Sequence, residues 1–369
     1  MKLNNKIFIV NKYYFSYFMI KIFYMFFAFL VYGKITRLGD TSGYINHSID
    51  FSMIIFYKST YMMNFVGGIC GKIFGYTVLS NLPFVILSFY GIYYSLKRLD
   101  LSNRDLFFVL LLLSFPSFGV WTSIVSKEAV GVFFMGIILG YIIDLYNGDK
   151  RKVKFIEYIA FYLMFVFKPQ YAVAIFSIII TIKLFRNINL RANAKLIYLM
   201  FYILMVIIGF YMVRDIVNEL SYIIPKNFSL DAGSTRENTI WVNDYDLYRN
   251  MLYGMFVAWW GPTISEVLSK PIQGIAFIES FIIFSFFIYF LLYILKNIIR
   301  TARLNIYLFS IGLFALFWLL FVHYPFGIFN PGSAIRYREN FYGFFVMFFY
   351  FIYLQIKYNI RSKSMEFKT

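Results

Sequence analysis

The chain has 369 residues, of which 61% are hydrophobic and only 14% are charged, and its mean hydropathy is +0.68. A soluble domain is usually about 45–50% apolar and about 25% charged, so this composition excludes an ordinary soluble protein. The net charge of +17 would suggest nucleic acid as a partner of a soluble protein. Here the basic residues gather in short loops between long apolar runs, which is the positive-inside pattern of membrane proteins. We therefore predict an all-α, polytopic membrane protein that binds no nucleic acid.

The apolar runs predict about ten transmembrane helices. In chain order they cover residues 14–33, 77–96, 106–121, 129–145, 156–167, 171–184, 196–213, 275–295, 306–322 and 341–358. Lys21 lies within the first run, and we expect its side chain to reach toward the cytoplasmic end. The run 61–76 is rich in glycine and contains Lys72, so it is predicted to lie in the interface or to dip into the membrane.

The orientation follows from the basic loops. Residues 97–98, 150–154, 186–195 and 296–303, together with the tail from 357, all lie on the cytoplasmic side if the N-terminus is inside. Both termini are therefore predicted to be cytoplasmic. The chain has no internal repeat and no linker, so residues 1–369 are expected to form a single transmembrane domain. Its two large external segments would be a first loop at 34–76 and a long loop at 214–270.

Motifs of soluble enzymes and of cofactor sites are missing from the sequence. It contains no P-loop, no GxSxG elbow, no HExxH and no Gly-rich dinucleotide turn. The single cysteine, Cys70, excludes an internal disulfide and a cysteine metal cluster. His323 has no second ligand beside it, which favours a structural role. We predict neither a cofactor nor a metal site.

The strongest functional signal is a pair of arginines, Arg336 and Arg338, at the outer start of the last apolar run. They follow a Pro-Gly break, and on extended backbone their side chains would point to the same side. Two guanidinium groups held in that way suit a phosphate or diphosphate. Arg236 and Arg249 lie in the long outer loop, where few basic residues are expected. All four favour an anionic ligand, with simple pairing to neighbouring glutamates as the alternative.

Three further charged residues are predicted to lie on the same side of the membrane. Asp40, in the first outer loop, is either a helix cap or a carboxylate that deprotonates a hydroxyl. Lys127 and Glu128 stand at the tip of a helical hairpin that also carries Trp121. They form either an interfacial ion pair or a contact with an anionic head group. These residues come from distant parts of the chain, yet the predicted topology brings them to one surface.

With these residues the chain resembles the GT-C type integral membrane glycosyltransferases, and especially the bacterial O-antigen and capsule repeat-unit polymerases called Wzy. The resemblance rests on the acidic first loop with Asp40, the hairpin tip with Trp121 and Lys127-Glu128, and the Arg-Tyr-Arg at residues 336–338. The long outer loop three spans before the end is also similar. The resemblance implies a GT-C-like fold in the bacterial inner membrane.

The resemblance also implies a reaction at the outer face on undecaprenyl-diphosphate-linked glycans, in which one glycan chain is transferred to a hydroxyl of another. That chemistry needs a base at the acceptor and cations on the leaving diphosphate, and no metal is required. The base would be Asp40, with Glu128, Glu237 and Glu339 as the next candidates. The implied diphosphate ligands are the cations of the outer face, namely Arg336, Arg338, Lys127, Arg236 and Arg249.

Two other functions remain open. A GT-C transferase that adds one sugar from a polyprenyl-phosphate donor would share the fold and the acidic first loop. A flippase or exporter of lipid-linked glycans belongs to another class, and it would need charged groups near the middle of its spans. For a polymerase, the expected partners are the lipid-linked glycans, the bilayer and a chain-length regulator.

Overall fold

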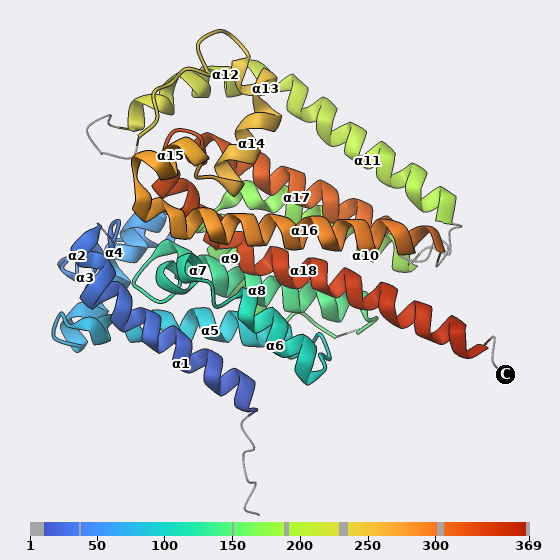
Figure 1. The fold of residues 1–369 in the computed structure, drawn as a ribbon, viewed down its shortest axis with the longest axis horizontal. Helices are drawn as coiled ribbons and strands as arrows, with labels where there is room; N and C mark the ends of the chain where they lie inside the picture. Colours follow the sequence, from blue (N-terminus) through green and yellow to red (C-terminus); the bar gives the residue numbers. More distant parts are fainter. Residues whose placement is uncertain are drawn as a thin grey trace, which may run out of the picture.

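The computed structural model describes residues 11–36, 38–149, 151–187, 192–228, 235–300 and 306–366. Within these ranges every regular element is a helix (Figure 1), which confirms the predicted all-α class. Six helices are long and apolar enough to cross a membrane, and a seventh crossing is present if one bent pair counts as a span. The chain is therefore a helical membrane protein. The larger number of about ten crossings and the orientation of the termini stay predictions.

The long helices are α1 (Lys12–Phe27), α4 (Ser59–Ile73), α5 (Leu82–Leu96), α8 (Lys127–Tyr146), α9 (Phe155–Phe167), α10 (Ala172–Asn187), α11 (Ala192–Met212), α16 (Gly274–Arg300), α17 (Ile306–Gly327) and α18 (Pro331–Glu366). The shorter ones are α2 (Gly33–Ile35), α3 (Thr41–Ile45), α6 (Asn103–Leu112), α7 (Pro116–Trp121), α12 (Arg214–Ile223), α13 (Asp246–Arg249), α14 (Met251–Trp260) and α15 (Ile264–Ser269). Most long helices run along the horizontal axis of Figure 1, and α11 lies apart at the upper right.

Helix α8 is the centre of the bundle and packs against α5, α9 and α18. It is apolar on all sides and almost wholly buried, as expected of a helix enclosed by others. Its approach to α5 depends on small residues, because a Cβ atom on Gly136 would collide with the backbone of Gly91. Such close backbone contact is typical of membrane helix pairs. The Ser95 hydroxyl donates a hydrogen bond to the Gly136 carbonyl and links the same two helices.

The predicted span 106–121 is broken into α6 and α7. Pro116 begins α7 at a position where a proline is favoured, and it disfavours helical backbone at Phe115. The loop after α7, residues 122–126, is completely buried rather than exposed at a hairpin tip. Lys21 of α1 enters this region and donates hydrogen bonds to the carbonyl and hydroxyl oxygens of Thr122. The prediction that Lys21 reaches toward the cytoplasmic end is therefore wrong, since a buried acceptor inside the bundle binds its ammonium.

The two short apolar runs after residue 155 form the bent pair, in which the chain turns through 114° between α9 and α10. The turn contains Lys168, which ends α9, and a short 3₁₀ segment, Pro169–Tyr171. Proline lacks the N–H that a continuous helix would need. The indole of Trp318 fixes the turn by donating a hydrogen bond to the Gln170 carbonyl.

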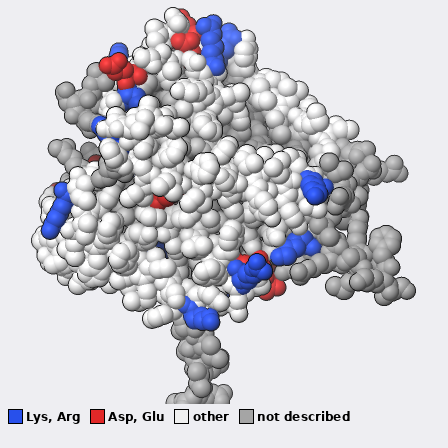
Figure 2. Space-filling view, viewed as in Figure 1, with Lys and Arg blue, Asp and Glu red and all other residues white. Residues whose placement is uncertain are grey.

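Both predicted external segments are largely helical. Among the described residues, the first holds α3 and α4, and the second holds α12 to α15. Most of the face drawn in Figure 2 is uncharged, although a small acidic group lies within it and other charged side chains are scattered around it. A largely uncharged flank is the surface that a bilayer requires.

Candidate functional site

Three residues from distant segments meet at the end of the bundle where α8 and α18 begin. The Nε atom of Arg336 in α18 lies 3.1 Å from Oε1 of Glu128 in α8. The Nη2 atom of the same guanidinium lies 3.4 Å from Oδ2 of Asp40, at the start of α3. Its central carbon lies 5.3 Å from the centre of the Trp121 ring. The predicted convergence of Asp40, Glu128 and Arg336 is therefore confirmed.

Helix caps position the starts of α8 and α18, which carry Glu128 and Arg336. The Ser126 hydroxyl accepts from the Ala129 amide and starts α8, which places Glu128 in the first helical turn. Asn330 accepts from the Ser333 amide, and Pro331 begins α18. Asp40 precedes α3, but its side chain makes no cap hydrogen bond. Its Oδ2 atom instead accepts from the Tyr44 hydroxyl, so the interpretation of Asp40 as a cap is wrong.

The expectation of extended backbone at Arg336 and Arg338 is also wrong, because both lie in α18. Residues two apart on an α-helix point about 200° apart, since each residue turns the chain by about 100°. Arg338 therefore faces the bundle interior and is 1% exposed. It pairs with Glu339 at 3.0 Å and lies 3.7 Å from Glu279. With these buried partners, Arg338 belongs to an internal charge cluster and not to the site at Arg336.

The two arginines of the long loop also lie elsewhere. Arg236 pairs with Glu266 and donates to the carbonyl oxygens of Gly327 and Ile328, so it ties the loop to the end of α17. Arg249 has a 70% exposed side chain and lies 3.8 Å from Asp246, one helical turn away. Their role as phosphate ligands stays a prediction, because in the structure each arginine lies beside an acid. Each has a local acid that the sequence pattern did not identify.

Lysines supply the further cations of the site. Lys127 does not pair with Glu128, and its ammonium donates to the Thr60 hydroxyl at 2.8 Å. Lys168, at the bend between α9 and α10, holds its ammonium 4.9 Å from the centre of the Tyr337 ring. The sequence pattern alone predicts no role for Lys168. The Lys-Pro sequence between two short apolar runs is the signal that could have found it, because it marks a buried turn.

Glu128 and Asp40 differ strongly in their surroundings. The Glu128 side chain is 1% exposed, whereas that of Asp40 is 62% exposed. One carboxylate oxygen of Glu128 accepts from Arg336, and the other, Oε2, is buried without a hydrogen-bond partner. A buried acceptor without a partner is costly and is suited to a ligand hydroxyl. Glu128 is therefore a better candidate for the base than Asp40, which reverses the predicted order.

Gly39 is a second residue that sequence reasoning missed. Its φ angle is +58°, which side chains rarely tolerate, and a Cβ atom on it would overlap the Arg336 guanidinium. The segment before α3 therefore approaches Arg336 closely only because residue 39 is a glycine. Its signal in the sequence is the Gly-Asp pair at the start of α3.

The arrangement favours an anion. Arg336 contacts both carboxylates, Lys127 is the neighbour of Glu128 in the chain, and Lys168 lies beside Tyr337, the neighbour of Arg336. The N-terminus of α8 adds positive potential. The described residues contain no group of three or more His, Cys, Asp or Glu side chains that could hold a metal ion.

Comparison of the chain with known protein families, with curated proteins and with solved structures finds no match.

Proposed function

We propose that this protein is a membrane glycosyltransferase that polymerises undecaprenyl-diphosphate-linked oligosaccharide repeat units at the outer face of the bacterial inner membrane. The observation that carries the proposal is the meeting of Arg336 with Glu128 and Asp40, beside Lys127 and Lys168. A transfer from a lipid diphosphate needs a hydroxyl-binding carboxylate and cations side by side, in contact with a membrane. The sequence resemblance to the Wzy polymerases supports the same reaction, with both termini in the cytoplasm.

In the proposed reaction, Oε2 of Glu128 accepts the proton of the acceptor hydroxyl. The oxygen of the acceptor hydroxyl forms a bond to the anomeric carbon of the donor glycan, and the bond from this carbon to the diphosphate oxygen breaks. The diphosphate leaves with the electron pair of that bond. Arg336, Lys127 and Lys168 stabilise the charge that develops on it. Asp40 holds the outer side of the Arg336 guanidinium and acts as a positioning residue.

The test is complementation of a deletion strain with Glu128→Gln and Arg336→Lys variants, followed by gel analysis of the surface glycan. A polymerase defect leaves a single repeat unit on its carrier. Arg249→Ala is the matched control, because Arg249 is exposed and outside the site. Long chains from both site variants, at wild-type protein levels, would overturn the proposed site.

The same gels separate the second candidate function, transfer of one sugar from a polyprenyl-phosphate donor. In that case the site variants accumulate an incomplete repeat unit rather than a complete single one. The favourable observation for this candidate is the same carboxylate–cation cluster, which suits a lipid monophosphate as well as a diphosphate.

A further inference from the structure

A polar groove lies at the opposite end of the bundle from Arg336, where α5 and α8 end. Its volume is about 440 Å³. Its lining residues come from α5, from the end of α8 and from the chain that leads into α9, and they are Tyr90, Tyr93, Tyr94, Lys97, Arg98, Asp144, Asp149 and Lys154. The candidate transferase site contains none of them. The groove therefore needs an explanation of its own.

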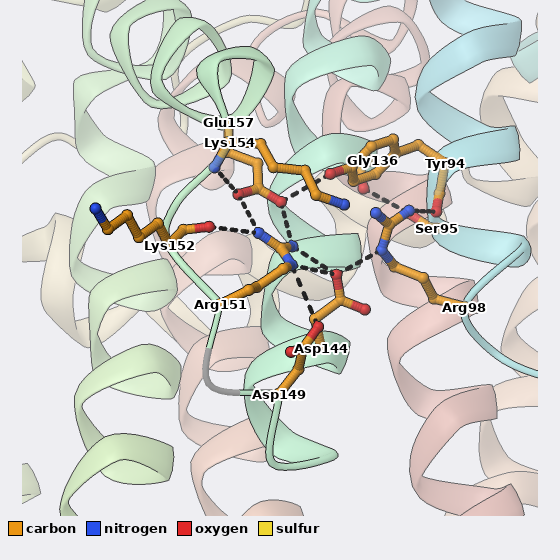
Figure 3. Close-up of polar contacts among 10 residues, drawn as sticks. All are labelled: Tyr94, Ser95, Arg98, Gly136, Asp144, Asp149, Arg151, Lys152, Lys154 and Glu157. Carbon is orange, nitrogen blue, oxygen red and sulfur yellow. Dashed lines mark hydrogen bonds and ion pairs between the residues drawn. The ribbon is translucent and has the colours of Figure 1, made fainter.

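The floor of the groove is a fixed charge network, shown in Figure 3. Arg98 pairs with Asp144 at 2.8 Å, and its guanidinium carbon lies 3.5 Å from the centre of the Tyr94 ring. Arg151 bridges Asp144 and Glu157, so it joins the end of α8 to the start of α9. Two arginines thus neutralise the two carboxylates that face them, and the network holds three helices together.

The side chains of two lysines at the rim of the groove remain outside this network, although the backbone amide of Lys154 donates a hydrogen bond to Glu157. Lys97 and Lys154 are exposed, and within the described ranges neither ammonium group has an ion pair with a carboxylate. The Lys97 ammonium lies 5.8 Å from the Tyr93 ring, which leaves its hydrogen-bond donors free. Asp149, the remaining acid of the lining, lies 3.4 Å from Arg151. The groove therefore offers two lysine ammonium groups without an ion pair, a net positive charge over its lining residues, and tyrosine hydroxyl groups.

The flanks of the groove are apolar. On α5, Ile86 and Tyr90 are 50% and 41% exposed, and on α9, Phe155 and Tyr158 are 80% and 61% exposed. Both helices belong to segments that are apolar enough to lie in a membrane. The groove has basic rims at the end of the bundle and exposed apolar side chains along both sides. These two features match the two parts of a lipid, its charged head group and its acyl chains.

We propose that this groove binds the phosphate head group of an anionic phospholipid. The ammonium groups of Lys97 and Lys154 bind the phosphate from both sides, and Tyr90 and Tyr93 line its approach. The acyl chains lie along the exposed faces of α5 and α9. Since the lipid would contact the arginine–carboxylate network, its binding stabilises the junction of α5, α8 and α9. The proposal is independent of the glycosyltransferase activity.

The test uses the purified full-length protein and native mass spectrometry, with phosphatidylglycerol, phosphatidylcholine and inorganic phosphate as separate probes. We expect phosphatidylglycerol to bind more tightly than phosphatidylcholine, and the Lys97→Ala/Lys154→Ala variant to lose this preference by on the order of tenfold. Lys58→Ala/Lys72→Ala is the matched control, because it removes two exposed lysines at the other end of the bundle. Lys97→Arg/Lys154→Arg should keep the preference.

Three outcomes would overturn the proposal. Equal affinity for the two lipids would remove the role of the head-group charge. An equal loss in the control variant would show only an effect of net charge. Inorganic phosphate that displaces phosphatidylglycerol as efficiently as the lipid itself would identify a soluble phosphate as the ligand. Thermal unfolding of each variant in neutral detergent shows whether the alanines alter the fold.

Discussion

Arg336 and Arg338 are two positions apart in α18, yet their guanidinium groups belong to different charge clusters. Arg336 pairs with Glu128 and Asp40 toward the end of the bundle, whereas Arg338 pairs with Glu339 and lies near Glu279 inside it. Helical geometry separates them, because side chains at i and i+2 point to nearly opposite sides. Substitutions at the two positions should therefore have different consequences, one for activity and the other for stability.

Arg336→Lys should reduce polymer formation by about 10²–10³-fold, the usual cost of losing one charge-stabilising donor. Lysine keeps a positive charge beside Glu128 but lacks the fork that reaches Glu128 and Asp40 together. The measurement is the length distribution of the surface glycan at matched protein levels. Unchanged chain lengths would contradict the role of Arg336.

Arg338→Met should destabilise the protein by about 3–5 kcal/mol, because it leaves buried carboxylates without their cation. The expected readout is a lower yield and a lower unfolding temperature in detergent. A second substitution, Glu339→Gln, should restore part of the loss, since it removes one of the unpaired charges. No rescue, or no destabilisation by Arg338→Met, would argue against the internal cluster.

Glu128→Gln should abolish activity more completely than Asp40→Asn. A general base contributes typically about 10²–10⁴-fold, and glutamine has the same shape but cannot accept a proton. Asp40 is exposed and contacts Arg336 at 3.4 Å, so its loss should act mainly through the position of that guanidinium. The comparison requires single-turnover rates with a lipid-linked glycan in both variants. A larger defect in Asp40→Asn would restore Asp40 as the base.

Lys168→Ala should weaken binding of the diphosphate, and Lys168→Arg should keep most of it. The reason is that the Lys168 ammonium, at the bend between α9 and α10, supplies positive charge beside Tyr337. Inorganic pyrophosphate, titrated calorimetrically into protein in nanodiscs, provides the measurement. Lys72→Ala serves as the control, because Lys72 is exposed in α4. Equal affinities of the alanine variant and the wild type would exclude Lys168 from the site.

The ion pair between Arg236 and Glu266 should weaken as the pH falls. Burial raises the pKa of Glu266, but hydrogen bonds from Arg236 and from the Thr263 amide outweigh it, and the net pKa lies below the ordinary value. The stabilisation is therefore complete above the unfolded-state pKa of about 4.3, and it is lost as the pH falls through the lower folded-state value. Wild type and Glu266→Gln should differ in unfolding temperature at neutral pH and converge in acid. A difference in unfolding temperature that does not change with pH would contradict a stabilising Arg236–Glu266 ion pair.

The sequence by itself determined the class of the protein and grouped three members of its central cluster. Long apolar runs can be stable only as helices in a membrane, since hydrocarbon leaves no other partner for backbone N–H and C=O groups. Asp40, Glu128 and Arg336 could be grouped in advance, because alternation of spans brings distant loops to the same end of a bundle. These conclusions need only hydropathy and order along the chain.

Only the tertiary structure decided which charges pair with one another. The direction of Arg338 depends on whether α18 starts before or after it, and its acid Glu279 comes from another helix. Arg236 pairs with Glu266, which lies 30 residues further along the chain, and no local sequence pattern predicts a pair at that separation. Lys168 joins the site only because α9 and α10 bend at that residue. Ion pairing is set by distances of a few ångströms between separate segments, and those distances exist only once the helices have packed.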